Sequence, residues 1–164
     1  MWIKIKKFAC LALAMALLAI CSGCGESSPD TKDVSVSDLA AAADSVLGTS
    51  DSMGDAGASV VEGLIKLTES DYEDCVVKIT VKGTSFDEYG IFKGKDANQA
   101  SSIEEAVKTY IQMRIDTDMG YQPEELPKLE NAEVRKIGSY VVYCILDDSS
   151  RSAVLSAVEQ ALSS

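Results

Sequence analysis

Histidine is absent from the 164-residue sequence. Without an imidazole, the chain has no Ser-His-Asp or Cys-His nucleophile and no histidine-ligated metal centre. Basic residues are scarce as well: 15 Lys and Arg stand against 26 Asp and Glu, which gives a net charge of −11. Nucleic-acid binding needs a basic surface, so this class of partner is excluded. The sequence also lacks the glycine-rich motifs that hold nucleotides, and we expect no cofactor.

The first 23 residues have the pattern of a secretory signal peptide. Residues 1–7 carry three lysines and no acid, and residues 8–20 are an unbroken run of apolar or small side chains. A helix that spans a bilayer needs about 20 apolar residues, so this run is short for that role. A basic start, a short apolar stretch and small residues at its end are typical of a signal peptide.

The cysteines at the end of this segment refine the prediction. Ser22-Gly23-Cys24 resembles the bacterial lipobox, although Cys21 replaces the leucine that is usual three residues before the modified cysteine. The resemblance implies diacylglycerol on the Cys24 thiol and cleavage after Gly23. A redox role for Cys21 and Cys24 as a C-x-x-C pair is disfavoured, because cleavage would remove Cys21.

Processing makes the protein more acidic and defines its partners. Loss of the three lysines changes the net charge from −11 to −14. An anionic membrane surface repels such a protein, so we expect it to reach the membrane through the lipid on Cys24. The same charge favours cationic or cation-bridged envelope ligands. Residues 24–36 are polar and are predicted to form a flexible tether, followed by a single domain at 37–163.

Apolar periodicity predicts the elements of that domain. Gly138-Ser139 is a signal for a type II′ hairpin, and Asp96 with Gln99 is a capping pair for the longest helix. The pattern gives helices at 37–47, 60–66, 97–119 and 151–163, and strands at 75–82, 85–93, 132–137 and 140–146. We therefore expect an α+β fold: a four-stranded antiparallel sheet from two ββα units, with helices on one face, preceded by two N-terminal helices.

Three stretches carry a family resemblance. Residues 87–96, 123–132 and 138–143 resemble, in order and spacing, a family of small lipoproteins from anaerobic Gram-positive bacteria that is known only as a domain of unknown function. The resemblance covers about residues 36–163. It implies a lipid-anchored protein in a Gram-positive envelope, and it carries over no catalytic residue.

Carboxylates are the abundant acid-base groups of the sequence. The pairs Asp87-Glu88, Glu124-Glu125 and Asp116/Asp118 are candidates for general acid-base work if burial shifts a pKa towards neutrality. Otherwise they belong to a solvated acidic face. Residues 116–127 begin like a calcium-binding EF-hand loop, but they lack its glycine at position six and its glutamate at position twelve, so we expect no metal site.

Two further sets of residues leave alternatives open. Cys75 and Cys144 lie on predicted strands, either as small core residues or as partners in a disulfide, which an extracytoplasmic location permits. Four tyrosines lie in or beside the predicted sheet, either as a ligand-binding face or as core residues with a polar tip: Tyr89, Tyr121, Tyr140 and Tyr143.

These observations favour a non-enzymatic binding or interaction module held at the outer face of the cell membrane by Cys24. An alternative is a histidine-free enzyme that uses paired carboxylates on cell-envelope material, which requires a cleft with a buried carboxyl. A third hypothesis is a purely structural component of the envelope.

Overall fold

The computed structural model describes residues 31–48, 52–118 and 120–163, so the predicted signal peptide and Cys24 lie outside the described residues. The elements follow in the order α1 (Val36–Leu47), β1 (Met53–Asp55), α2 (Ala58–Ile65), β2 (Asp74–Thr80), β3 (Glu88–Lys93), α3 (Ala97–Asp118), α4 (Leu126–Glu130), β4 (Glu133–Ile137), β5 (Tyr140–Ile145) and α5 (Asp148–Ser163). Within these ranges no helix has both the length and the apolar character to cross a bilayer.

The sheet is fully antiparallel and has five strands in the order β1-β2-β3-β5-β4. The α+β class is confirmed, but the prediction of four strands is wrong. The missed strand is β1, which pairs Met53 with Thr80 and Asp55 with Lys78 at the edge of the sheet. Three residues inside a stretch rich in glycine and serine are too few to display the alternation that identifies a strand.

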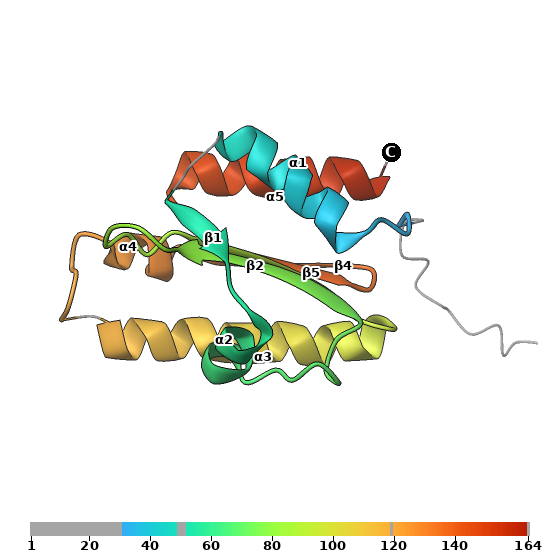
Figure 1. Ribbon diagram of the computed structural model, residues 1–164, viewed down its shortest axis with the longest axis horizontal. Helices are drawn as coiled ribbons and strands as arrows, with labels where there is room; N and C mark the ends of the chain where they lie inside the picture. Colours follow the sequence, from blue (N-terminus) through green and yellow to red (C-terminus); the bar gives the residue numbers. More distant parts are fainter. Residues whose placement is uncertain (1–30, 49–51, 119, 164) are drawn as a thin grey trace, which may run out of the picture.

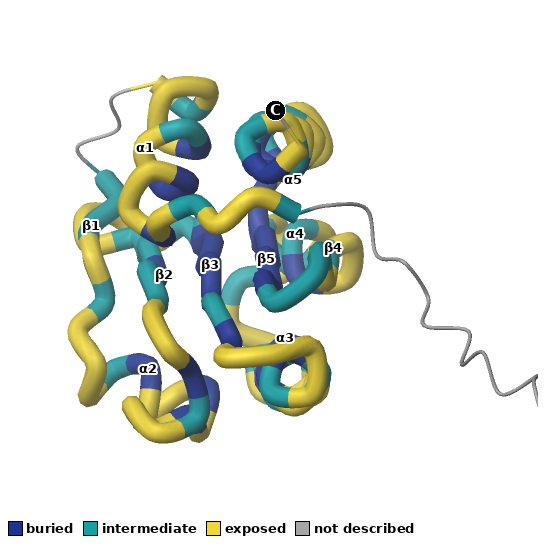
Figure 2. The backbone as a smooth tube through the Cα atoms, turned by 90° about the vertical axis from the view of Figure 1, so that its right-hand side faces the viewer, coloured by how far each residue is buried: buried dark blue, intermediate teal, exposed yellow. Residues whose placement is uncertain are grey.

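Helices cover both faces of the sheet, which corrects the expectation of helices on one face. Figures 1 and 2 show α1 and α5 on one side of the sheet and α2 and α3 on the other, with α4 packed beside α3. Every residue of β5 is buried, as is β3 except for Lys93 at its end. A strand buried on both faces shows a continuous apolar run instead of an alternating one, and residues 140–146 are such a run.

The segment before α1, residues 31–35, bonds to the last helix and to β5. The backbone N–H of Lys32 donates to the Leu162 carbonyl (3.0 Å), and the Tyr140 hydroxyl donates to the Val34 carbonyl (2.8 Å). Ser35 rather than Ser37 caps α1, accepting from the N–H of Asp38 at 3.1 Å. Residues 31–36, which the sequence assigns to the tether, therefore contact the domain.

Both ends of the described chain lie at the same end of the molecule, on the right in Figure 1. Here Lys32 meets Leu162, and the turn of the β4–β5 hairpin at Gly138 and Ser139 bonds through the Ser139 carbonyl to the N–H of Gly94 (2.8 Å). The φ of Gly138 is +60°, as the first position of a type II′ turn requires. We call this end of the molecule, which holds Lys32, Leu162 and the Gly138-Ser139 turn, the terminal end.

A short helix, α4, lies between α3 and β4, where the sequence predicted no element. It begins at Leu126, with Pro127 in its first turn, where a proline costs no backbone hydrogen bond. Leu129 of this helix is buried in the core that α3 forms with the sheet. The acidic segment after α3 is thus anchored at the end of the molecule opposite to the terminal end.

A glycine in β3 makes room for a tyrosine side chain of the neighbouring strand β5. Gly90 of β3 pairs with Tyr143 of β5, and the tyrosine ring lies directly over the glycine. A Cβ at position 90 would be only 2.2 Å from Cε1 of Tyr143. Position 90 therefore has no room for any side chain while Tyr143 keeps its place.

We expect Gly90→Ala to destabilise the domain by about 1–3 kcal/mol or more, because the methyl group displaces the buried Tyr143 ring. Gly63→Ala is the matched control: position 63 lies within α2, where an added methyl group would meet no atom within 4 Å, so alanine should stabilise by about 0.5–1 kcal/mol. Urea unfolding of the chain from residue 25 onward measures both. Equal effects of the two substitutions would contradict the packing of Tyr143 on Gly90.

Candidate functional site

The four tyrosines of the sequence analysis lie in three different places in the structure. Tyr143 points to the α3 side of the sheet, whereas Tyr89 and Tyr140 belong to the core under α1 and α5. All three are almost completely buried, and Tyr89 donates to Asp44 of α1 at 2.6 Å. Tyr121 lies apart from them on the loop after α3 with an exposed fraction of 80%.

The two core cysteines are free thiols and do not form the disulfide that the sequence left open. Cys75 pairs with Phe92 in the sheet and Cys144 pairs with Tyr89, so β3 separates the two strands. Cys75 packs with the α3 side and Cys144 with the α1 side. Side chains on opposite faces of a sheet cannot be bridged without moving the backbone.

Glu88 is a carboxylate inside the core, with an exposed fraction of 3%. Its Oε1 accepts from the Tyr143 hydroxyl at 2.6 Å, and its Oε2 accepts from the Tyr110 hydroxyl at 2.9 Å. Arg114 of α3 donates to the same Oε2 at 3.2 Å and to the Tyr110 hydroxyl at 2.9 Å. Both carboxylate oxygens are therefore occupied by side chains that α3 and β5 bring to the first residue of β3.

Burial raises the pKa of the Glu88 carboxyl, against the opposing effect of the hydrogen bonds from Tyr143, Tyr110 and Arg114. A raised pKa is a property of catalytic acids, but structural networks produce it too. Glu88 has no free oxygen with which to reach a substrate. These contacts describe a structural residue, which connects the sheet to α3 by hydrogen bonds, better than an acid-base catalyst.

A second cluster lies next to Glu88 and continues to the surface. Lys128 of α4 donates to Asp87 (2.7 Å), Glu125 (2.8 Å) and the Ser85 hydroxyl (2.9 Å). Burial disfavours the charged form of Lys128, but its bonds to Asp87 and Glu125 outweigh this and raise its pKa. Glu125 also accepts from the backbone N–H of Phe86 at 2.9 Å. These contacts fix α4 against the loop between β2 and β3.

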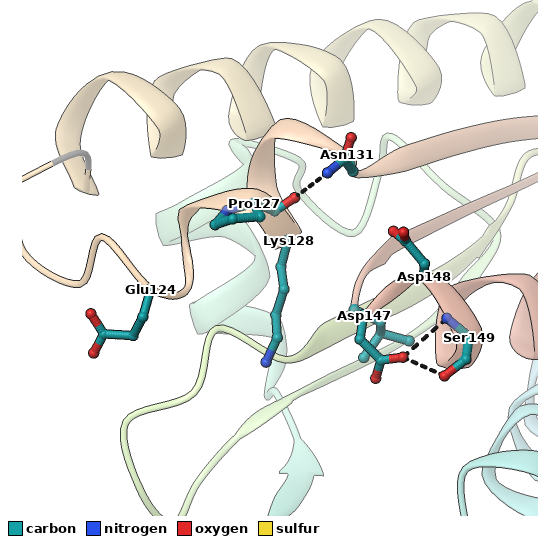
Figure 3. A pocket seen from close by; sticks show the side chains of 8 residues that line it. Glu124, Pro127, Lys128, Asn131, Asp147, Asp148 and Ser149 are labelled. Carbon is teal, nitrogen blue, oxygen red and sulfur yellow. Dashed lines mark hydrogen bonds between the residues drawn. The ribbon is translucent and has the colours of Figure 1, made fainter.

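A pocket of about 480 Å³ opens between α4 and the start of α5. Figure 3 shows Lys128 and Asn131 on one side of it and Asp147, Asp148 and Ser149 on the other. The lining residues are Glu124, Pro127, Lys128, Asn131, Leu146, Asp147, Asp148 and Ser149. A second, more open hollow is lined by α3 alone and is a furrow on that helix.

The lining of the α4–α5 pocket carries three carboxylates and one lysine. Asp147 caps α5: its Oδ1 accepts from the N–H and hydroxyl of Ser149 and from the N–H of Ser150. These hydrogen bonds lower the pKa of Asp147, so it is ionised at neutral pH. Lys128 is already bonded to Asp87 and Glu125, which leaves the pocket with an excess of negative charge.

Of the predicted carboxylate pairs, only Glu124-Glu125 and Asp87-Glu88 lie near the pocket or its supporting cluster. Asp118 pairs with Arg114, and Asp116 accepts from Gln112 along α3. In the part of the chain that the structure describes, no three acidic or cysteine side chains are grouped so as to hold a metal ion.

Several residues of the site were not singled out from the sequence: Lys128, Asn131 and Asp147–Ser149. The signal for Asp147 was present, because an acid followed by polar residues before an apolar helix is an N-cap pattern. Nothing local indicates that this cap lies opposite α4, since 15 residues, which contain the β4–β5 hairpin, lie between Asn131 and Asp147.

A family described as domain of unknown function (DUF4358) matches residues 48–146. The resemblance to a domain of unknown function is thus confirmed over that range, which contains all five strands but neither α1 nor α5. No curated protein and no solved structure matches the chain.

The raised pKa of Glu88 makes stability depend on pH. The folded state holds this proton to higher pH than the unfolded chain does, so the contribution of Glu88 to the free energy of unfolding falls as pH rises through the interval between the two pKa values. We expect the stability difference between wild type and Glu88→Gln to decrease as pH rises above the pKa of an unfolded glutamate, which is about 4.

Urea unfolding at a series of pH values measures this difference. Glu62→Gln, at an exposed position of α2, is the matched control and should leave the pH profile unchanged. A difference that instead grows with pH would mean that Arg114 and the two tyrosines outweigh burial at Glu88.

Proposed function

The chain belongs to the DUF4358 family, whose function is unknown, so we propose a function from the chain's own residues. The protein is a non-enzymatic binding module that is anchored to the outer face of the cytoplasmic membrane of a Gram-positive bacterium. It binds a cationic group in the α4–α5 pocket.

The observation that supports a binding role is the negative charge of the α4–α5 pocket. Its three acids, Glu124, Asp147 and Asp148, are all exposed, and Asp148 also bonds Arg151 at 2.8 Å. The buried Leu146 and the ring of Pro127 supply apolar surface beside them. Carboxylates around a small apolar wall suit an amine or guanidinium on an aliphatic stem. The rigid support from Lys128 and its partners keeps α4 in place without using the pocket acids.

Binding is favoured over catalysis by the state of the carboxyls. An enzyme that uses two carboxylates needs one of them protonated near neutral pH. Hydrogen bonds at the start of α5 lower the pKa of Asp147, which is the opposite shift. Glu88, whose pKa is raised, is enclosed in the core and has both oxygens occupied. Neither the pocket nor the Glu88 network therefore supports the alternative of a carboxylate-dependent enzyme that acts on envelope material.

The membrane anchor rests on the sequence alone. Residues 1–23 have the pattern of a signal peptide, and Ser22-Gly23-Cys24 has the pattern of a lipid attachment site. Two acyl chains are enough for stable anchoring, whereas one chain is marginal. An acidic domain with a net charge of −14 after processing gains nothing from an anionic surface, so the lipid is its means of attachment.

The anchor predicts a labelling result in cells. Growth with an alkyne-tagged fatty acid should label the wild-type protein and leave Cys24→Ala unlabelled, because the thiol is the attachment point. Cys21→Ala is the matched control and should keep its label. A labelled Cys24→Ala protein would refute the assignment of the anchor.

The pocket predicts a charge-specific binding result. Spermidine, with amines on an aliphatic stem, serves as the probe, and ¹⁵N NMR shifts of the chain from residue 25 onward report its binding. We expect the double variant Glu124→Gln/Asp148→Asn to raise the Kd by about three- to tenfold, since each exposed charge pair contributes up to about 1 kcal/mol.

The matched control removes the same charge elsewhere. Glu62→Gln/Asp116→Asn changes two exposed acids outside the pocket and should alter the Kd by less than about twofold. Equal weakening by the two double variants would show that spermidine responds to overall charge and would refute the pocket as the site.

A further inference from the structure

The terminal end and the pocket lie at opposite ends of the molecule. Figure 1 shows the segment that leads into α1 and the C-terminus at one end and α4 at the other. Helix α5 connects the two: its last turn meets Lys32, and its first residues line the pocket. Helix α3 runs the same way, from beside Gly94 to the loop that leads into α4.

These elements give the separation of the two ends. Sixteen residues of α5 correspond to a length of about 24 Å. Twenty-two residues of α3 correspond to about 33 Å. The pocket is therefore about one α5 length away from the point where the chain leaves the terminal end.

The segment between the lipid site and the domain is short by comparison. Because residues 31–36 are held on the domain, only seven residue steps separate Cys24 from Thr31. A fully extended chain of that length reaches about 24 Å. This reach only matches the length of α5, so turning the domain over to bring the pocket to the bilayer requires an almost fully extended tether, which costs conformational entropy.

We propose that the lipid on Cys24 holds this domain with its terminal end towards the membrane and its α4–α5 pocket directed away from it. This orientation rests on the lipid anchor proposed above. The pocket then takes its cationic group from the aqueous or cell-wall side and not from a lipid headgroup. The net negative charge of the domain is repelled by an anionic bilayer, so the domain is also disfavoured from lying flat on the membrane.

Energy transfer to the bilayer tests the orientation. The full mature, lipid-bearing protein is reconstituted into vesicles of phosphatidylcholine and phosphatidylglycerol that contain a rhodamine-labelled lipid as acceptor. A donor dye is placed on Ser163→Cys at the terminal end or on Glu124→Cys at the pocket, each in a Cys75→Ser background because Cys75 is half-buried and Cys144 is buried. Transfer from position 163 should exceed transfer from position 124 by about twofold or more, given the separation along the helices.

A longer tether supplies the control. Insertion of a long Gly/Ser segment between Cys24 and Thr31 lets the domain turn over, so the difference between the two dyes should shrink. Equal transfer from both dyes with the native tether, stronger transfer from position 124, or a difference that the insertion leaves unchanged would overturn the proposed orientation. The lipid anchor is read separately: protein that fails to float with the vesicles would refute the anchor itself.

Discussion

The buried carboxylate of Glu88 is the constraint around which the α3 side of the sheet is arranged. A charged group in an apolar core is tolerated only when its hydrogen bonds are complete, and removal of one donor leaves a costly unpaired oxygen. Tyr143 has to reach Oε1 from the neighbouring strand, which requires a glycine at position 90. Tyr110 and Arg114 have to reach Oε2 from α3, which sets the position of that helix over the sheet. Arg114 also lies over the Phe86 ring, at 5.1 Å from its centroid, and so connects the network to the loop that Lys128 holds.

The two faces of the sheet differ in their relation to the family match. Residues 48–146 include the whole α3 side, with Glu88 and its three donors, and one wall of the pocket. The other face is covered by α1 and α5, which both lie outside the matched residues and pack along each other. Polar contacts again fix this layer, since Arg135 and Arg151 share Glu133, and Arg151 also bonds Asp148 at the rim of the pocket. The pocket is thus built where the matched and unmatched parts of the chain meet.

Local signals in the sequence account for much of the fold and for little of the site. The Gly138-Ser139 turn and the Asp96 cap were predictable, because a few neighbouring residues determine them. The second helical layer was missed although the unbroken apolar run at 140–146 indicated a strand with two buried faces. The environment of Glu88 was not predictable, since its donors lie 22, 26 and 55 residues away and meet only through tertiary packing. The same holds for the pocket, whose walls belong to elements on either side of the β4–β5 hairpin.

The pairing of the first helix with the last has a consequence for how the chain acquires its structure. Helix α1 buries Leu39 and Ala43 against a partner, α5, that is synthesised about a hundred residues later. Until α5 is synthesised, only α1 can pack on this face of the central strands, which includes Tyr89 and Val142. Contacts of such large sequence separation are slow to form and leave apolar surface open in the meantime. Completion of this layer therefore has to wait for the C-terminal residues, and a chain truncated before α5 retains an α1 that packs on β2 and β3 without its partner helix.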